Sequence, residues 1–405
     1  MASGALSGLR VIDLADERGV YCAKVLADLG ADVVRVEPPG GDRLRGFGPF
    51  YRGQRHSDRS VYFWHYNTSK RSLTLDVTRP VGRDVFLKLV DSADVLIESF
   101  GPGYMASIGL GYPDLSSRNP GLVFTSITPF GQHGPCAHMP ANDVVLCALG
   151  GMMNVNGDPD KPPLAAFGEQ SYHVAANFGA ASTLAAIAYR RHSGRGQHID
   201  VSAEACVAGF IEHVNYFYLY NEMIAVRQGS LHWSLAFAIV RCQDGYSMIS
   251  LMHHWQDHLA WMLSDGFGEN LAGPAPRPGQ MPDYPTRKAN AEFRLAEIAR
   301  WAATKSVDEF AREGQERRLP FARVLNVDQV FQNPQLRARG FFVDVQHPEL
   351  GETFTYPGAP FVMHGTPWAI RRRPPLVGEH TEEVLRGELG LGAGELADLR
   401  RAGVV

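Results

Sequence analysis

Residues 9–37 read LRVIDLADERGVYCAKVLADLGADVVRVE, and this stretch decides the fold class. Two short apolar runs of strand type, at 9–14 and 32–37, flank the helical pattern AKVLADLGA. A helix that joins two buried strands implies parallel pairing with a right-handed crossover. The first turn, LADERGVYCAK, lacks GxGxxG. We therefore predict a Rossmann-like α/β fold without a dinucleotide fingerprint.

The alternation of strands and helices continues to about residue 130. Further strands are predicted at 71–77, 94–100 and 121–130, with helices at 80–91 and 104–108. This pattern predicts a large, doubly wound domain. Because ligands of such sheets bind at the carboxyl ends of the strands, the loops to consider follow Glu37, Asp76, Phe100 and Pro129.

The middle of the chain predicts a second, smaller domain. At 405 residues the chain exceeds the size at which one core keeps growing, so two domains are the default. The segment AFAIVRCQDGYSMISL predicts a hairpin that turns at Asp244-Gly245. Helical segments follow this hairpin, which indicates a small α+β domain.

The composition excludes several classes of protein. The formal net charge of -4 provides no basic field for nucleic acid. The start, MASGALSGLRVIDLA, lacks a signal-peptide pattern, and no uninterrupted apolar run reaches about 18 residues. Five widely spaced cysteines form no CxxC pair, which argues against a disulfide framework and a zinc site. We expect a cytoplasmic protein that binds no metal, nucleic acid or membrane.

Residues 163–197, PLAAFGEQSYHVAANFGAASTLAAIAYRRHSGRGQ, form the first candidate site of chemistry. They run from a loop into a long Ala-rich helix, with Glu169 and Tyr172 at the junction. A helix N-terminus stabilises a carboxylate or a developing anion by about 0.3 to 1 kcal/mol. Glu169 is therefore either a capping acid of the first turn or a reactive carboxylate.

Eight stretches carry a recognisable set of motifs: LADLGADVVRVEPPGGD (26–42), NTSKRSLTLDV (67–77), ADVLIESFGPG (93–103), IGLGYPDL (108–115), NPGLVFTSITPFGQHGP (119–135), RRHSGRGQHIDVS (190–202), VFQNPQLRARGFF (330–342) and PPLVGEHTEEVL (374–385). Through them the chain resembles the class III coenzyme A (CoA) transferase family, or CaiB/BaiF family, over most of its length.

The resemblance implies a large doubly wound domain built from both chain ends, residues 1–224 and 331–405, and a small domain at 225–330. It also implies an interlocked, ring-like dimer, either a homodimer or a heteromer with a sister subunit of the family. The expected reaction moves CoA between carboxylic acids, with an acyl-CoA thioester as substrate and no permanently bound cofactor. In the transferases of the family, one Asp attacks the thioester. Such catalysis needs a positioned carboxylate and backbone donors for the oxyanion.

The position of the family nucleophile is altered in this chain. The nucleophilic Asp normally follows a Gly and lies at a fixed distance before GRGQ. Counting back from Gln197 without a gap places Tyr172 there, whereas allowing three extra residues places Glu169 there, behind Gly168. A Glu has one more methylene to accommodate, and misplacement by about 1 Å can lower the rate about a hundredfold.

Other departures concern the expected contacts to CoA. Ser107 and Met139 stand where the family commonly has basic residues, and Ser99 stands within ESF where ENF is common. Losing two desolvated cations would weaken CoA binding by roughly 1 to 3 kcal/mol each. These departures resemble the non-catalytic subunit of a heteromeric member such as succinyl-CoA:benzylsuccinate CoA transferase. An active transferase with Glu169 as nucleophile, a silent subunit of a transferase, and an acyl-CoA racemase or isomerase all stay open.

Four charged residues are candidate ligands of CoA. Lys70 and Arg71 stand just before a predicted strand, near the expected ligand edge, as phosphate ligands would. Arg35 and Asp42 match ligand-edge motif positions of the family. For Lys70 and Arg71 the alternative is a pair of solvated charges.

Asp143 and the histidines at 253–258 could be functional residues or ordinary structural ones. The racemases use a His and an Asp as bases, but in PANDVV the His position is Asn142, with Asp143 beside it. Asp143 is kept as a catalytic candidate, although a loop Asp most often caps a helix, here one that begins near Val144. In the small domain, residues 253–258 read HHWQDH. Packing is favoured over metal binding because no carboxylate stands at ligand spacing from these histidines.

Overall fold

The computed structural model of the chain describes residues 4–251, 254–271 and 283–405. Its contacts divide the chain into two compact units. Unit 1 comprises residues 1–152, 165–220 and 335–405. Unit 2 comprises residues 153–164 and 221–334. Both ends of the chain therefore belong to the same unit, as the resemblance implied.

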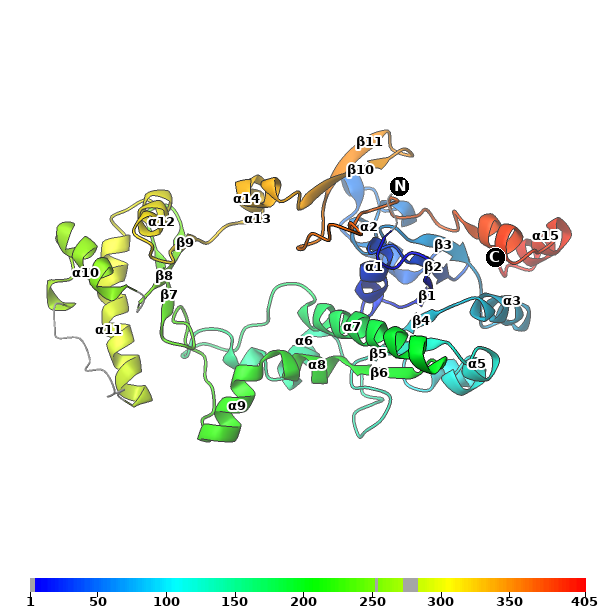
Figure 1. The fold of residues 1–405 in the computed structure, drawn as a ribbon, viewed down its shortest axis with the longest axis horizontal. Helices are drawn as coiled ribbons and strands as arrows, with labels where there is room; N and C mark the ends of the chain where they lie inside the picture. The colour runs from blue at the N-terminus through cyan, green and yellow to red at the C-terminus, as the bar shows by residue number, and fades with distance from the viewer. Residues whose placement is uncertain (1–3, 252–253, 272–282) are drawn as a thin grey trace. The chain divides into compact units, whose positions relative to one another are not determined.

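Unit 1 is built on a six-stranded sheet whose strand pairs are all parallel. The strands lie in the order β3 (Arg71–Thr74), β2 (Asp32–Glu37), β1 (Arg10–Leu14), β4 (Val95–Glu98), β5 (Val123–Thr128) and β6 (His198–Ser202) (Figure 1). This is the doubly wound order of a Rossmann-like fold, in which the direction of winding reverses between β1 and β4. The predicted fold class is confirmed.

Alternate residues of the strands supply two cores, one on each face of the sheet. In β1, Val11 joins a cluster with α1 (Val20–Asp28), α6 (Asp143–Leu149) and α7 (Gln170–Ser193). The next residue, Ile12, joins a cluster on the other face with α3 (Pro80–Asp91), α5 (Tyr112–Arg118) and α15 (Ala393–Arg401). The short helix α4 (Tyr104–Ser107) adds Met105 to this second cluster. Because both faces are covered, the strands read as nearly continuous apolar runs.

The C-terminal part of the chain completes unit 1. An antiparallel hairpin of β10 (Phe342–His347) and β11 (Glu352–Pro357) packs on α2 (Val61–Tyr66). The rings of Trp64 and Phe354 lie 5.4 Å apart. At the far end, the amide of Asp76 donates a hydrogen bond of 2.8 Å to the carbonyl of Val404. The predicted return of the C-terminus to the first domain is thus observed.

Helix α7 positions the candidate site. It begins behind Glu169 and ends at Gly194, whose φ of 70° is the left-handed conformation that favours glycine. Its buried positions are mostly small, including Ala175, Ala176 and Gly179. A Cβ added to Gly179 would lie 2.8 Å from Ile127 of β5, so glycine permits the close approach of helix and sheet.

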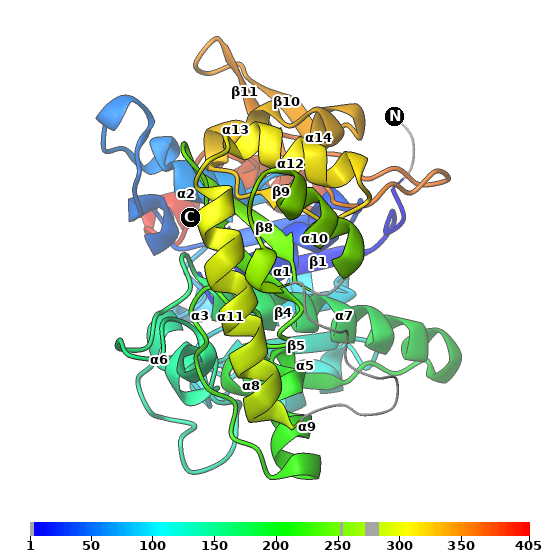
Figure 2. The same cartoon turned by 90° about the vertical axis from the view of Figure 1, so that its left-hand side faces the viewer.

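Unit 2 is a small α+β unit, as predicted. β7 (Phe237–Arg241) and β8 (Tyr246–Ser250) form the expected hairpin, and β9 (Ala322–Arg323) pairs with β8. Helix α11 (Tyr284–Ala302), labelled in Figure 2, lies against β7. Its buried Trp301 packs with rings of α10 (Trp255–Ser264) and α12 (Val307–Glu316). In unit 1, α8 (Ala203–Phe210) packs on α7 and is followed by α9 (Glu212–Asn221), which ends at the boundary between the units; α13 (Val327–Gln332) belongs to unit 2, and α14 (Pro334–Ala338) begins at the next boundary.

Among the described residues, no helix is long and apolar enough to cross a membrane.

Candidate active site

The first turn of α7 brings together all three predicted catalytic residues. Glu169 occupies the N-cap position, with φ −99° and ψ 64°, and its side chain makes no capping hydrogen bond. Tyr172 lies in the first turn of the helix, and Asp143 of α6 contacts Ser171. The simple capping role considered for Glu169 is therefore wrong: its carboxylate is directed to another partner.

That partner is Tyr62 of α2. The Tyr62 hydroxyl donates a 2.6 Å hydrogen bond to Oε2 of Glu169. Partial burial raises the pKa of the half-buried Glu169 carboxyl; the hydrogen bond from Tyr62 opposes this shift, whereas the charges of Glu17 and Asp143 add to it. A carboxylate with a raised pKa is more basic, and therefore a better nucleophile while it remains ionised.

Asp143 anchors the start of α7. Its Oδ1 accepts hydrogen bonds of 2.8 Å from the Ser171 amide and 2.7 Å from the Ser171 hydroxyl. The expectation that Asp143 caps its own helix is corrected: α6 begins at Asp143, and its N-cap is Asn142, whose side chain accepts from the Val145 amide. Asp143 is buried and acts on the following helix instead. Its catalytic role stays a prediction.

Tyr172, at the position that ungapped counting gives to the nucleophile, is a core residue. Its side chain is 5% exposed and belongs to the apolar cluster between α7 and the sheet. Burial raises the pKa of Tyr172 to about 12, and the Glu17 charge adds to the shift. The phenol is therefore protonated at neutral pH and is a poor nucleophile.

An aromatic cluster that was not predicted contacts Glu169 through Tyr62. The Tyr62 and Tyr66 rings lie 4.8 Å apart, and the Tyr66 hydroxyl is 2.7 Å from Nε2 of His173. The Tyr21 ring lies 5.1 Å from that of His173. The spacing of Tyr62 and Tyr66, four residues apart, was a signal that both occupy one helix face. Nothing in the sequence placed that face beside residue 169.

The structure gathers three of the four predicted CoA ligands around a buried carboxylate. Asp13 accepts hydrogen bonds of 2.8 Å from both Lys70 and Arg35, and Arg35 also pairs with Asp42. Lys70 makes two more bonds, to the carbonyl of Val20 and the side chain of Asn67, so its three donors are used within the protein. Burial lowers the pKa of Lys70 to about 8, against the opposing charge of Asp13.

Arg71 lies apart from this group. Its guanidinium donates a 2.6 Å hydrogen bond to Asp32, the first residue of β2, and pairs with Glu383 and Glu388 of the C-terminal segment. The amino ends of the strands lie at this edge, opposite to the edge where ligands bind in such sheets. Arg71 is buried there, and acidic partners neutralise its charge, so the solvated charge considered for this residue is wrong.

The loops after β1 and β4 meet where the winding reverses. The Asp16 amide donates a 2.7 Å hydrogen bond to Oγ of Ser99, which in turn donates to the Asp16 carboxylate. Beside them, Glu98 is almost fully buried and accepts a 2.7 Å bond from the Phe100 amide. Burial raises the pKa of Glu98 to about 7, although hydrogen bonds from Ser126 and Phe100 oppose the shift. This crevice is the expected ligand edge of a doubly wound sheet.

Comparisons with known proteins agree with this geometry. Residues 6–381 match the description of CoA-transferase family III. The chain belongs to CoA-transferase family III. It is 34% identical, over 98% of both chains, to succinyl-CoA:(R)-benzylsuccinate CoA-transferase subunit BbsE from Thauera aromatica. It is 35% identical to succinyl-CoA:mesaconate CoA-transferase from Haloarcula hispanica, over 96% of this chain and 98% of the other.

The fold agrees with the family as well. A CAIB/BAIF family protein from Brucella suis has a TM-score of 0.84 and 29% identity, covering 96% of this chain and all of that one. Two altered positions of this family III chain are accessible: Met139 is 51% exposed, and the Ser107 hydroxyl donates to the carbonyl of Tyr104. Neither side chain can supply the positive charge that the resemblance led us to expect at these positions.

In the histidine-rich segment of unit 2, His254 is exposed and lies 3.6 Å from the carboxylate of Asp257, whereas His258 is a packing residue. His258 is fully buried between the rings of Trp255, Trp301 and Phe321. His253 lies outside the described residues. No group of His, Cys, Asp or Glu in the described parts of the chain is arranged to hold a metal ion.

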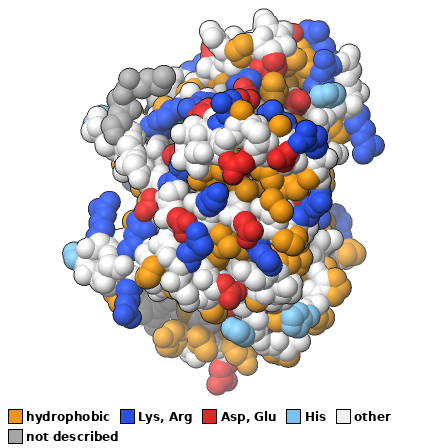
Figure 3. Space-filling view, turned by 90° about the vertical axis from the view of Figure 1, so that its right-hand side faces the viewer, with side chains coloured by type: hydrophobic (Ala, Val, Ile, Leu, Met, Phe, Trp, Pro, Cys, Tyr) orange, Lys and Arg blue, Asp and Glu red, His pale blue; other side chains and the backbone are white. Residues whose placement is uncertain are grey.

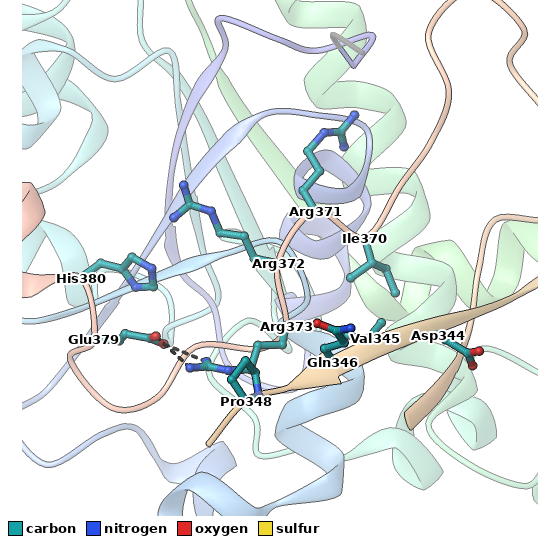
Figure 4. A pocket seen from close by; sticks show the side chains of 10 residues that line it. All are labelled: Asp344, Val345, Gln346, Pro348, Ile370, Arg371, Arg372, Arg373, Glu379 and His380. Carbon is teal, nitrogen blue, oxygen red and sulfur yellow. Dashed lines mark hydrogen bonds and ion pairs between the residues drawn. The ribbon is translucent and has the colours of Figure 1, made fainter. Parts of the chain in front are cut away.

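A pocket of about 440 Å³ in unit 1 lies away from α7 in the sequence and in its lining. It is formed by β10 and the segments 370–373 and 379–380. Figure 4 shows that Arg371 and Arg372 point away from the Arg373–Glu379 ion pair, so the three guanidinium groups do not converge. This pocket contains none of the predicted site residues.

Proposed function

We propose that this chain is a subunit of an acyl-CoA:carboxylate CoA-transferase in which Glu169 carries CoA between two acids. The observation behind this proposal is the position of the Glu169 carboxylate at the start of α7. It accepts a hydrogen bond from Tyr62 and makes no capping hydrogen bond to the helix. The relatives' names pair succinyl-CoA with benzylsuccinate or mesaconate. We therefore propose succinyl-CoA as donor and a second dicarboxylic acid as acceptor.

In the proposed reaction, a Glu169 oxygen attacks the thioester carbon and the C–S bond breaks. CoA leaves as the thiolate, and a mixed anhydride of Glu169 and succinate remains. The thiolate then attacks the Glu169 carbonyl carbon, which releases succinate and forms a glutamyl-CoA thioester. The acceptor carboxylate then attacks the carbonyl carbon of the glutamyl-CoA thioester, which releases the CoA thiolate and forms a second mixed anhydride. The thiolate attacks the acceptor's carbonyl carbon, so the acceptor leaves as its CoA ester and the Glu169 carboxylate is regenerated. The N-terminal end of α7 favours the negative charge that develops at each step.

A covalent adduct tests this proposal. The purified chain is mixed with succinyl-CoA, and its intact mass and peptide masses are measured, with Glu169→Gln as the matched control. We expect CoA on Glu169 in the natural chain and none in the variant. The absence of both an adduct and CoA binding would contradict the proposal.

A second candidate is a silent subunit beside a catalytic sister chain. It is favoured by the buried phenol of Tyr172 at the ungapped nucleophile position and by the subunit status in the name of one relative. Co-expression with a sister subunit that has the family's Gly-Asp pair at the nucleophile position distinguishes this candidate from a chain that uses Glu169. CoA found only on the sister's Asp, with full activity of the Glu169→Gln heteromer, would favour this candidate.

We further propose that the chain acts as an interlocked dimer, with itself or with such a sister. Exposed apolar side chains support a partner: Phe210 of α8 and Tyr218, Leu219 and Tyr220 of α9 are 58% to 82% exposed. Contiguous apolar surface of this kind marks interaction sites. On the face drawn in Figure 3, acidic and basic side chains are interspersed with apolar ones, so that face carries no field of a single sign.

For CoA itself, we propose the carboxyl edge of β1, β2 and β4. Asp42 lies in the loop after β2, where it pairs with Arg35, and Arg35 and Lys70 both donate to Asp13 of β1; these pairs support the loops of that edge. Direct contacts of these residues and of Arg71 with CoA stay predictions. Binding of CoA to single alanine variants, measured by calorimetry, tests each one.

A further inference from the structure

Tyr62 is held in a defined orientation on α2. Ser60 caps this helix, since its hydroxyl accepts a 3.0 Å bond from the Phe63 amide. The Tyr62 ring is flanked by Phe47, 5.3 Å away, and by Tyr66, 4.8 Å away. These two ring contacts restrict the Tyr62 ring and so favour one direction of its hydroxyl. That direction leads to Oε2 of Glu169.

We propose that Tyr62 is the positioning residue of the nucleophile, which it holds through one carboxylate oxygen so that the other attacks the thioester. This inference rests on the proposed function of Glu169. Glutamate has one more rotatable bond than aspartate, and a free side chain would spread over several rotamers. A hydrogen bond to Oε2 selects one of them and directs Oε1. Tyr62 thereby compensates for the longer side chain at this position.

The hydrogen bond also affects the charge of Glu169. A donor to a carboxylate favours the ionised form, so Tyr62 lowers the pKa of Glu169. The other groups that face Glu169 act in the opposite direction: Glu17 in the loop after β1 and Asp143 of α6 are both acidic. Partial burial adds to their effect. Removal of the phenolic hydroxyl should therefore raise the pKa of Glu169.

Tyr62→Phe removes only this hydroxyl, and Tyr66→Phe is its matched control. Tyr66 lies on the same helix and in the same cluster, but its hydroxyl contacts His173 instead of Glu169. The rate of CoA adduct formation from succinyl-CoA is measured against pH for the three proteins. For Tyr62→Phe we expect a rate about tenfold or more lower and an acidic limb shifted to higher pH. For Tyr66→Phe we expect a rate and pH profile close to those of the natural chain.

A titration that does not depend on catalysis tests the role of Tyr62 separately from the proposed role of Glu169 as nucleophile. In protein labelled with ¹³C at glutamate Cδ, the Glu169 signal is identified by its loss in Glu169→Gln and is followed against pH. We expect the pKa of Glu169 to be higher in Tyr62→Phe than in Tyr66→Phe. An unchanged pKa together with an unchanged adduct rate would overturn the role of Tyr62. A raised pKa without any adduct in the natural chain would overturn the proposed nucleophile and leave the Tyr62–Glu169 contact established.

Discussion

Glu98 is a carboxyl group placed where ionisation is unfavourable. Its side chain is 3% exposed at the carboxyl end of β4, and burial raises its pKa from 4.5 to about 7. An acid whose pKa is higher in the folded chain binds more protons there than in the unfolded chain. Its contribution to stability is therefore complete below pH 4.5 and is lost as the pH rises through about 7.

The variant Glu98→Gln keeps the shape and the acceptor oxygen but cannot ionise. We expect it to raise the free energy of unfolding at pH 8 by up to about 3 kcal/mol relative to the natural chain, and to change it little at pH 4.5. Urea unfolding followed by circular dichroism at both pH values measures the difference. An equal effect at the two pH values would show that ionisation of Glu98 is not the cause.

At the scale of single elements, α7 depends on Asp143 for its first turn. The carboxylate accepts both the amide and the hydroxyl of Ser171. Asp143→Ala should destabilise the protein by about 1 to 2 kcal/mol, the usual effect of losing a cap. Asp143→Asn keeps the accepting oxygen, so we expect most of the stability and of the CoA-transferase activity to remain. Loss of activity in a stable Asn variant would instead assign Asp143 a catalytic proton transfer.

The elements were predictable where the pattern is local. The strands at 9–14 and 32–37 were expected within one residue, because apolar runs between polar turns are visible in the sequence. Residues 203–221 form two helices, α8 and α9, which are interrupted at Ile211. Gly209 stands just before this interruption, and glycine is unfavourable in a helix interior, so the sequence holds a local signal for the break.

At the scale of the whole molecule, exposed apolar side chains predict self-association or a sister partner. The double variant Leu219→Arg with Tyr220→Arg places two charges on α9, where the natural side chains are 72% and 82% exposed. If α9 lies in an interface, these charges should shift a dimer to the monomer. Val81→Arg, at a 56% exposed position of α3, is the control that should not do so. Sedimentation velocity measures the distribution, and a dimer unaffected by the α9 charges would exclude this surface.

The domain limits expected at 224/225 and 330/331 stay a proposal about folding units. The contacts divide the chain at 220/221 and 334/335 and also assign residues 153–164 to the smaller unit. Residues 153–164 read MNVNGDPDKPPL, a Pro-rich loop sequence, but nothing in that composition assigns the loop to the smaller unit.

The sequence by itself determined the parallel doubly wound sheet, the small α+β unit and the membership of CoA-transferase family III, because periodicity and motifs are properties of adjacent residues. Only the tertiary structure decided which side chains meet. Tyr62 and Glu169 are 107 residues apart, and Asp13 and Lys70 are 57 apart. Such contacts depend on how the strands are ordered and how the helices pack. They place Lys70, expected to be either a CoA phosphate ligand or a solvated charge, in a buried contact with Asp13, and they place Glu169, expected to be either a capping acid or a reactive carboxylate, beside the hydroxyl of Tyr62.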